Sequence, residues 1–320
     1  MRGATAVIAV AFAGLGWAGT ATASQLIDRN ASRIKLAVNT KSEALLTYRV
    51  EGRVRHVLAW GAIDARHPTS GRPQVRFKKD YAGGWGKYRT QYWRTFRNAC
   101  GKYTGPRLAF LVTACAAPDG SYWAVQTWQT ALPDLGMIPW LSRQRAWELH
   151  LSHWSGPLAR IEAWNDWIYS GRFHEVFGRL TYDGHPVHGF GTTPTGAPTD
   201  GYGRLIYLDT LNSRYGKGWR RENSFVAHKP TGVFCYGFFR FDPTKGYPHP
   251  DGYPSTLRGP GNGQKYRLTV IGPGVTPDVT MTIGGLHDFN KNNPEDVAYE
   301  KQQNAILDSI VSTDKLCRQH

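Results

Sequence analysis

The residues best suited to chemistry are concentrated between Trp147 and Phe190. Tryptophan, carboxylate and histidine side chains follow one another closely in this stretch: Trp147, Trp154, Trp164 and Trp167; Glu148, Glu162, Asp166, Glu175 and Asp183; His150, His153, His174, His185 and His188. Paired carboxylates hydrolyse glycosidic bonds, and aromatic rings offer flat faces to ligands. The stretch therefore predicts a glycan site, either for binding alone or for hydrolysis.

The predicted local structure decides which carboxylates can form a pair. Alternating side chains and Gly-containing turns predict successive β-strands, so Glu162 and Asp166 share a strand face about 13 Å apart, at roughly 3.3 Å per residue. Glycosidases need separations of about 5–5.5 Å or 6.5–9.5 Å. A cross-strand pair meets this requirement, because neighbouring strands lie about 4.8 Å apart. The predicted catalytic set is Glu148, Glu162 and Glu175, with Trp164 as the sugar platform and Asp166 as a further ligand-binding residue. The alternative is a solvated face with cross-strand charge pairs.

A second stretch of interest, residues 72–107, holds ten basic residues and one acidic residue, Asp80. Aromatic residues are interleaved with the cations. This composition predicts an anion-binding face in which rings stack and cations meet carboxylate or phosphate. The predicted ligand-binding residues here are Trp85, Arg89, Arg94 and Arg97. The alternative is an ordinary solvated face whose aromatic side chains are buried.

Helical spacing within this basic stretch predicts a short helix near residues 87–99. Tyr88, Tyr92, Phe96 and Ala99 recur at intervals of three or four residues, and Gly101 follows as a stop signal. We expect the apolar face of this helix to be buried and its arginines to point outward.

The first 23 residues read as a secretory signal peptide. A short charged start at Arg2 precedes an apolar run over residues 4–18, and Ala21-Thr22-Ala23 fits a cleavage site before Ser24. We therefore expect a secreted, extracellular protein without a membrane span. Its formal charge of +15 favours an anionic or glycan cell-surface polymer as partner, and an extracellular location disfavours nucleic acid.

The four cysteines indicate two disulfides in an exported chain. Proximity favours Cys100–Cys115, which leaves Cys235–Cys317. His188-Gly189 and the later Gly232-Val233-Phe234-Cys235 resemble pieces of the L,D-transpeptidase family, and the resemblance implies Cys235 as a nucleophile in cell-wall transpeptidation. The residues before the cysteine, the longer spacing and the missing arginine after it all depart from that family.

Metal motifs are incomplete in this sequence. His150 and His153, three residues apart on a strand, face opposite sides and so make a poor metal pair. Asp288, Asn290 and Asn292 have the alternate-oxygen spacing of a calcium loop, but glycine and glutamate are missing from their required positions. We expect no cofactor, with calcium as the one candidate.

The pattern of strands and turns predicts a mainly β fold, an antiparallel β-sandwich-like single domain over residues 24–320, with the short helix near 87–99 and a C-terminal helix. Asn293 and Pro294 mark the start of the latter. Its expected apolar face is Ala298, Gln302, Ala305, Ile306 and Ile310. Two functions follow: a binder of anionic or glycan surface polymer, and a glycoside-hydrolase-like enzyme. The binder is favoured, because no spacing in the sequence fixes a catalytic pair, whereas the basic stretch is present regardless.

Overall fold

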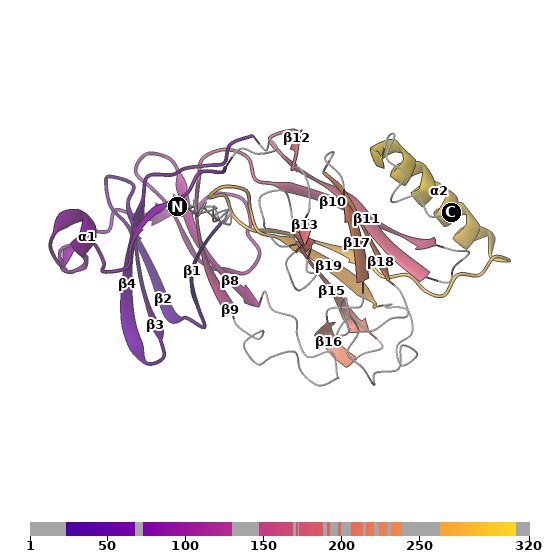
Figure 1. Ribbon diagram of the computed structural model, residues 1–320, viewed down its shortest axis with the longest axis horizontal. Helices are drawn as coiled ribbons and strands as arrows, with labels where there is room; N and C mark the ends of the chain where they lie inside the picture. The colour runs from indigo at the N-terminus through magenta and orange to yellow at the C-terminus, as the bar shows by residue number, and fades with distance from the viewer. Residues whose placement is uncertain are drawn as a thin grey trace, which may run out of the picture.

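The computed structural model describes residues 24–67, 73–129, 147–168, 171, 173–187, 191–192, 198–199, 206–213, 216–220, 224–228, 232–238 and 263–311. These residues form antiparallel sheets, as the sequence predicts, with one helix at each end of the long axis of the molecule (Figure 1). The predicted signal peptide lies outside the described residues. Among the described residues, no helix combines the length and apolar character needed to cross a membrane.

The N-terminal sandwich consists of two sheets packed face to face. One sheet has the order β1 (Gln25–Arg29), β9 (Trp147–Trp154), β8 (Tyr122–Gln129), β7 (Leu111–Ala116), β6 (Gly101–Lys102). The other has the order β2 (Ser32–Val38), β3 (Ala44–Val50), β4 (Arg53–Trp60), β5 (Lys78–Asp80). Alternation along β3 sends Leu46 and Tyr48 into the core, where they join Trp123 of β8 and Leu149 of β9.

The C-terminal sandwich repeats this arrangement with a second core. One sheet has the order β10 (Arg160–Ile168), β11 (Phe173–Tyr182), β18 (Val233–Phe238), β17 (Ser224–His228), and β12 (His185–Pro186) pairs with β11. The other has the order β16 (Gly216–Arg220), β15 (Ile206–Ser213), β19 (Lys265–Val270), β20 (Val279–Gly284). Val176, Phe234, Tyr266 and Leu268 fill the space between them. A separate short ladder joins β13 (Gly191–Thr192) to β14 (Pro198–Thr199).

The loop 271–278, between β19 and β20, joins the two sandwiches. It belongs to the C-terminal sandwich by sequence, yet Val275 is fully buried in the N-terminal core. The Val275 carbonyl accepts the His153 N–H of β9, and the Val275 N–H donates to the Asp64 carbonyl. A single domain over residues 24–320 stays a prediction, and this shared loop is the feature that supports it.

The predicted helix near 87–99 is wrong in its bounds. The chain forms a four-residue helix α1 (Trp85–Tyr88) and a 3-10 turn η1 (Tyr92–Arg94). Arg89, with φ of 58°, takes the left-handed conformation and ends α1. The aromatic series still clusters without helical backbone, since the ring centroids of Tyr88 and Tyr92 are 4.1 Å apart.

Helix α2 (Pro294–Val311) confirms the predicted C-terminal helix and its start. Asn293 Oδ1 accepts the Glu295 N–H, as expected of an N-cap. The expected apolar face is wrong, because Ala298, Gln302 and Ala305 are exposed. The buried stripe is Asp296, Gln303, Leu307 and Val311, and it covers the outer face of β11 and β18 at Phe177, Val233 and Cys235.

One predicted disulfide is confirmed, between Cys100 and Cys115, with their Cα atoms 5.5 Å apart. It ties the end of the basic stretch to β7. Cys317 lies outside the described residues. Cys235 is itself disulfide-bonded, so the thiolate required of a transpeptidase nucleophile is absent there.

Candidate functional sites

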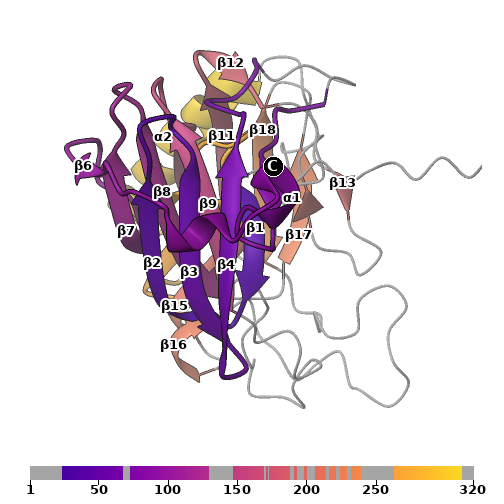
Figure 2. The same cartoon turned by 90° about the vertical axis from the view of Figure 1, so that its left-hand side faces the viewer.

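The basic stretch lies across the outer face of the sheet β2–β3–β4–β5, at one end of the molecule (Figure 2). Its aromatic residues hold it in place: Trp93 stacks on His56 of β4 with ring centroids 4.1 Å apart. Lys87 lies 4.3 Å from the centre of the Trp60 ring and forms an ion pair with Glu43. Trp93 therefore has a structural role, but it is half-buried and Trp85 is exposed, so the alternative of buried aromatic side chains does not hold for α1 and η1.

The arginines of this stretch point to solvent. Arg89, Arg94 and Arg97 are exposed, and within the described part of the chain none of them forms an ion pair with a carboxylate. The Arg94 guanidinium lies 5.1 Å from the centre of the Trp93 ring, and this cation–π contact helps to position it. The predicted outward cations are thus present, and they are unneutralised.

Two cations of the sheet itself belong to the same face, and the sequence analysis missed them. In the register Lys35 opposes Thr47, and Thr47 opposes His56, which puts Lys35 on the face that Trp93 covers. Arg49, two residues beyond Thr47, faces the same way. Both cations are exposed. Strand alternation could have identified them. We define the basic face as Lys35, Arg49, Arg89, Arg94 and Arg97.

Two acidic groups near the basic face, Glu43 and Asp80, are already engaged. Glu43 is buried and binds Lys87, the Tyr88 hydroxyl and the Asn39 amide. Burial opposes the ionised form of Glu43, but these partners hold its pKa below the usual range. Asp80 accepts the backbone N–H groups of Ala82 and Lys87. The face is therefore open to an external anion. Trp85, which is 53% exposed, adds an aromatic ring beside it.

The predicted catalytic carboxylates do not come together. Glu148 lies in the N-terminal sandwich, where it pairs with Arg29 and His150. Glu162, on β10, lies between Arg160 and Arg179 and opposes Arg179 in the register. Two of the three are thus occupied by cations, which weakens the case for hydrolysis.

Glu175 instead pairs with Asp166 across the β10–β11 ladder, beneath α2. The two side chains are buried, and no described cation forms an ion pair with either. Burial raises the pKa of Asp166 to about 7, and the nearby Glu300 adds to this rise. Burial and the neighbouring Asp166 raise the pKa of Glu175 to about 8. The sheet face on which the glycan site was predicted is therefore covered at Asp166 and Glu175, and both acids stay protonated to a higher pH than exposed carboxyl groups do.

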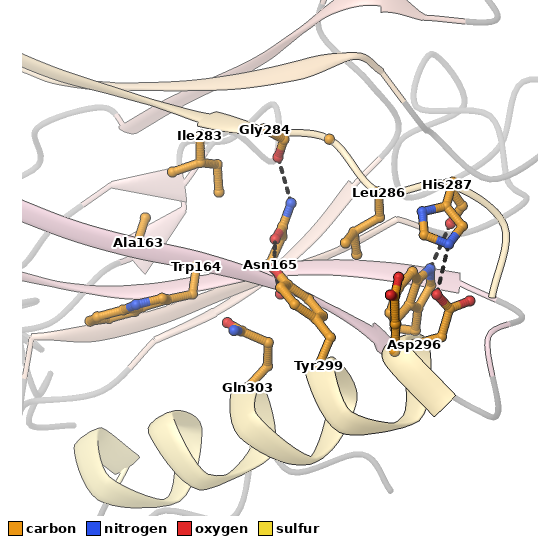
Figure 3. Close-up of a pocket in the computed structure, with 13 residues that line it drawn as sticks. Ala163, Trp164, Asn165, Ile283, Gly284, Leu286, His287, Asp296, Tyr299 and Gln303 are labelled. Carbon is orange, nitrogen blue, oxygen red and sulfur yellow. Dashed lines mark hydrogen bonds and ion pairs between the residues drawn. The ribbon is translucent and has the colours of Figure 1, made fainter. Parts of the chain in front are cut away.

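Trp164, the predicted sugar platform, lies on the wall of a pocket of about 490 Å³ at the edge of β10 (Figure 3). The pocket is bounded by β10, the segment 283–287 and α2. Trp167 Nε1 donates to the His287 carbonyl over 2.7 Å, and Asn165 donates to the Gly284 carbonyl. These bonds fix the segment 283–287 against the edge strand.

The calcium candidate residues form the turn before α2. Asn290 Oδ1 accepts the Asn292 N–H, and the Asn290 N–H donates to the buried Asp296. Asp288 is exposed. Among the described residues, no group of three or more His, Cys, Asp or Glu side chains is placed to hold a metal ion.

No protein-family model matches this chain, and no curated protein or solved structure shows significant similarity to it. The function is therefore argued from the two sites alone.

Proposed function

We propose that this protein binds an anionic cell-surface polymer through the basic face. The observation that carries the proposal is the set of exposed arginines, Arg89, Arg94 and Arg97, which lack carboxylate partners in the described structure. Exposed cations of one sign concentrate a polyanion near a surface, and guanidinium groups bind carboxylate and phosphate oxygens in a bidentate manner.

The backbone of this face supports multivalent binding. Trp93 and Lys87 anchor the stretch to β4, and the Cys100–Cys115 disulfide fixes its far end. Because these cations are held in place before binding, less free energy is spent on ordering the protein than if they lay on a flexible loop. A repeating anion with carboxylate or phosphate groups can contact several cations at once, which raises the apparent affinity.

The test measures retention of the protein on insoluble anionic polysaccharide, phosphate-bearing cell-wall polymer and neutral polysaccharide, at low and high salt. We expect retention on the anionic polymers alone, and loss of retention at high salt because salt screens exposed charges. Replacing three arginines by glutamine, R89Q/R94Q/R97Q, should weaken retention by roughly 10-fold or more.

The matched control is K265Q/K291Q/K301Q, which removes three exposed cations, one each from β19, the turn before α2 and α2. It has the same net charge as the arginine variant but keeps the basic face, so it should be retained on the anionic polymers nearly as well as the wild type. Equal loss in both variants would show that total charge, not this face, is responsible. Release of reducing ends from any polymer would support the hydrolase alternative instead.

A further inference from the structure

Helix α2, which bounds the pocket beside β10, lies at the opposite end of the molecule from α1 (Figure 1). The aromatic rings of Trp164, Trp167 and Tyr299 line the pocket, together with the polar side chains of Asn165 and Gln303. Its volume of about 490 Å³ lies within the range of small-molecule sites, which are mostly apolar with a few placed polar groups.

The buried side chain of Gln303 indicates that this pocket is a binding site and not only a packing defect. It occupies the buried stripe of α2, between Asp296 and Leu307, and is only 5% exposed. Its Oε1 atom has no hydrogen-bond partner within the described structure, and the residue lies on the pocket wall. A buried amide oxygen without a donor costs roughly 1–3 kcal/mol of stability, whereas an apolar residue would cost nothing there. A hydrogen-bond donor on a ligand would satisfy this oxygen.

Tyr299 lies one turn before Gln303 on the same face of α2, and both side chains point toward β10 (Figure 3). The Tyr299 hydroxyl donates to Asn165 Oδ1 and retains its capacity to accept a hydrogen bond. An acceptor on Gln303 and an acceptor on Tyr299 are thus close to the ring of Trp164. A ligand with hydroxyl donors and an apolar ring face satisfies all three.

The charges around the pocket favour a neutral ligand. His287 pairs with Asp296, which also accepts the Asn290 N–H and the Asn293 amide. Among the described lining residues no other cation is present, and Glu295 is exposed at the rim. An anionic ligand would therefore find no unpaired cation here.

We propose that this pocket is a binding site for a neutral sugar ring, with Gln303 and Tyr299 binding its hydroxyls and Trp164 packing against its apolar face. This site is independent of the basic face, and its ligand differs from the polymer proposed above. Pyranose rings combine axial C–H faces with equatorial hydroxyls, which is the combination that the pocket wall matches.

The test titrates the protein with three neutral trisaccharides, of β-linked glucose, α-linked glucose and β-linked N-acetylglucosamine, and follows tryptophan fluorescence. We expect saturable binding of at least one of them at millimolar concentration or below. Gln303→Leu should weaken that binding about 10-fold, the equivalent of one buried hydrogen bond, without lowering Tm. The matched control is Gln302→Leu, because Gln302 is exposed on the same helix and should leave binding unchanged.

Two results would overturn the proposal. One is the absence of saturable binding by all three trisaccharides. The other is a Gln303→Leu variant that binds like the wild type, whatever its Tm, because Gln303 would then act only in packing. Neither result bears on retention by anionic polymers, so the fate of this site can be read separately from that of the basic face.

Discussion

Two groups of buried acids lie in the two halves of the molecule, and their surroundings differ. Where the sandwiches meet, His150 lies between Asp278 and Glu148, with its Nδ1 2.7 Å from Asp278 Oδ2 and its Nε2 3.1 Å from Glu148 Oε2. Beneath α2, Asp166 and Glu175 face each other without a described cation between them.

The difference lies in the protonation state that each site favours. Burial alone would lower the pKa of His150, but the two carboxylates raise it to about 9, so the imidazolium form is favoured at neutral pH. Burial opposes ionisation of Glu148, yet His150 and Arg29 hold its pKa below the usual range. Asp166 and Glu175 gain no such partner, and their pKa values rise to about 7 and 8. A buried carboxylate keeps its charge only where the fold supplies a cation.

Breaking the charged group should have the largest effect on stability. Asp278 is fully buried and accepts hydrogen bonds from Trp128 Nε1 and the Gly272 N–H as well as contacting His150. Asp278→Asn would leave the imidazolium without its main partner and set an amide N–H against other donors. We expect a loss of about 3–5 kcal/mol in the free energy of unfolding, measured by urea titration.

Glu51→Gln, at the exposed turn between β3 and β4, is the control for removing an acid from this sandwich. It should change the free energy of unfolding by less than about 0.5 kcal/mol. A loss below about 1 kcal/mol for Asp278→Asn would contradict the description of this group as a buried ion pair.

The buried acids Asp166 and Glu175 should make the stability of the protein depend on pH. Because the pKa values of Asp166 and Glu175 are raised in the folded state, the folded protein binds more protons than the unfolded chain above about pH 4. Its stability is therefore full at low pH and falls as pH rises toward 7–8. The double variant Asp166→Asn/Glu175→Gln should remove this fall, which amounts to roughly 3–6 kcal/mol between pH 5 and pH 8, because each acid contributes up to about 1.4 kcal/mol per pH unit while it is protonated only in the folded state.

The free energy of unfolding is measured for the variant and the wild type at both pH values. His150 lowers stability above pH 6.5 in both proteins, so only the difference between them reports on Asp166 and Glu175. Identical slopes of stability against pH in the two proteins would show that the acid pair is ionised at neutral pH, and the contrast between the two groups would be lost.

The smallest effect should come from Glu162, whose arginine partners are solvent-exposed. Arg160 and Arg179 keep 74% and 44% of their side-chain surface exposed, so water and salt screen both pairs. Glu162→Gln should cost at most about 1 kcal/mol and should leave polymer retention unchanged. A larger loss, or altered retention, would place Glu162 in a functional role that the present structure does not support.

Local patterns predicted the parts of the fold that depend on local chemistry. The disulfide Cys100–Cys115 and the start of α2 at Asn293 follow from sequence proximity and capping, and both are confirmed. The buried face of α2 was missed because it includes the polar residues Asp296 and Gln303, which an apolar pattern does not identify. Their burial depends on contacts with β10 and the segment 283–287, which no local pattern contains.

The candidate sites also contain features that local sequence predicts and features that depend on distant residues. The outward arginines of the basic face follow from composition, whereas the two ends of the Glu148–His150–Asp278 group lie 130 residues apart in sequence. Glu175 was matched with Glu162, but the register pairs it with Asp166. Register depends on the length of the connection between β10 and β11, and a shift of four residues changes the partner of every side chain.

Hydrogen–deuterium exchange with and without anionic polymer tests the central claim most directly, because it locates the contact. The account predicts slower exchange on polymer binding over residues 33–49 and 81–102, and unchanged exchange over residues 283–311. Protection confined to 283–311, or an exchange pattern that the polymer does not alter, would contradict binding at the basic face.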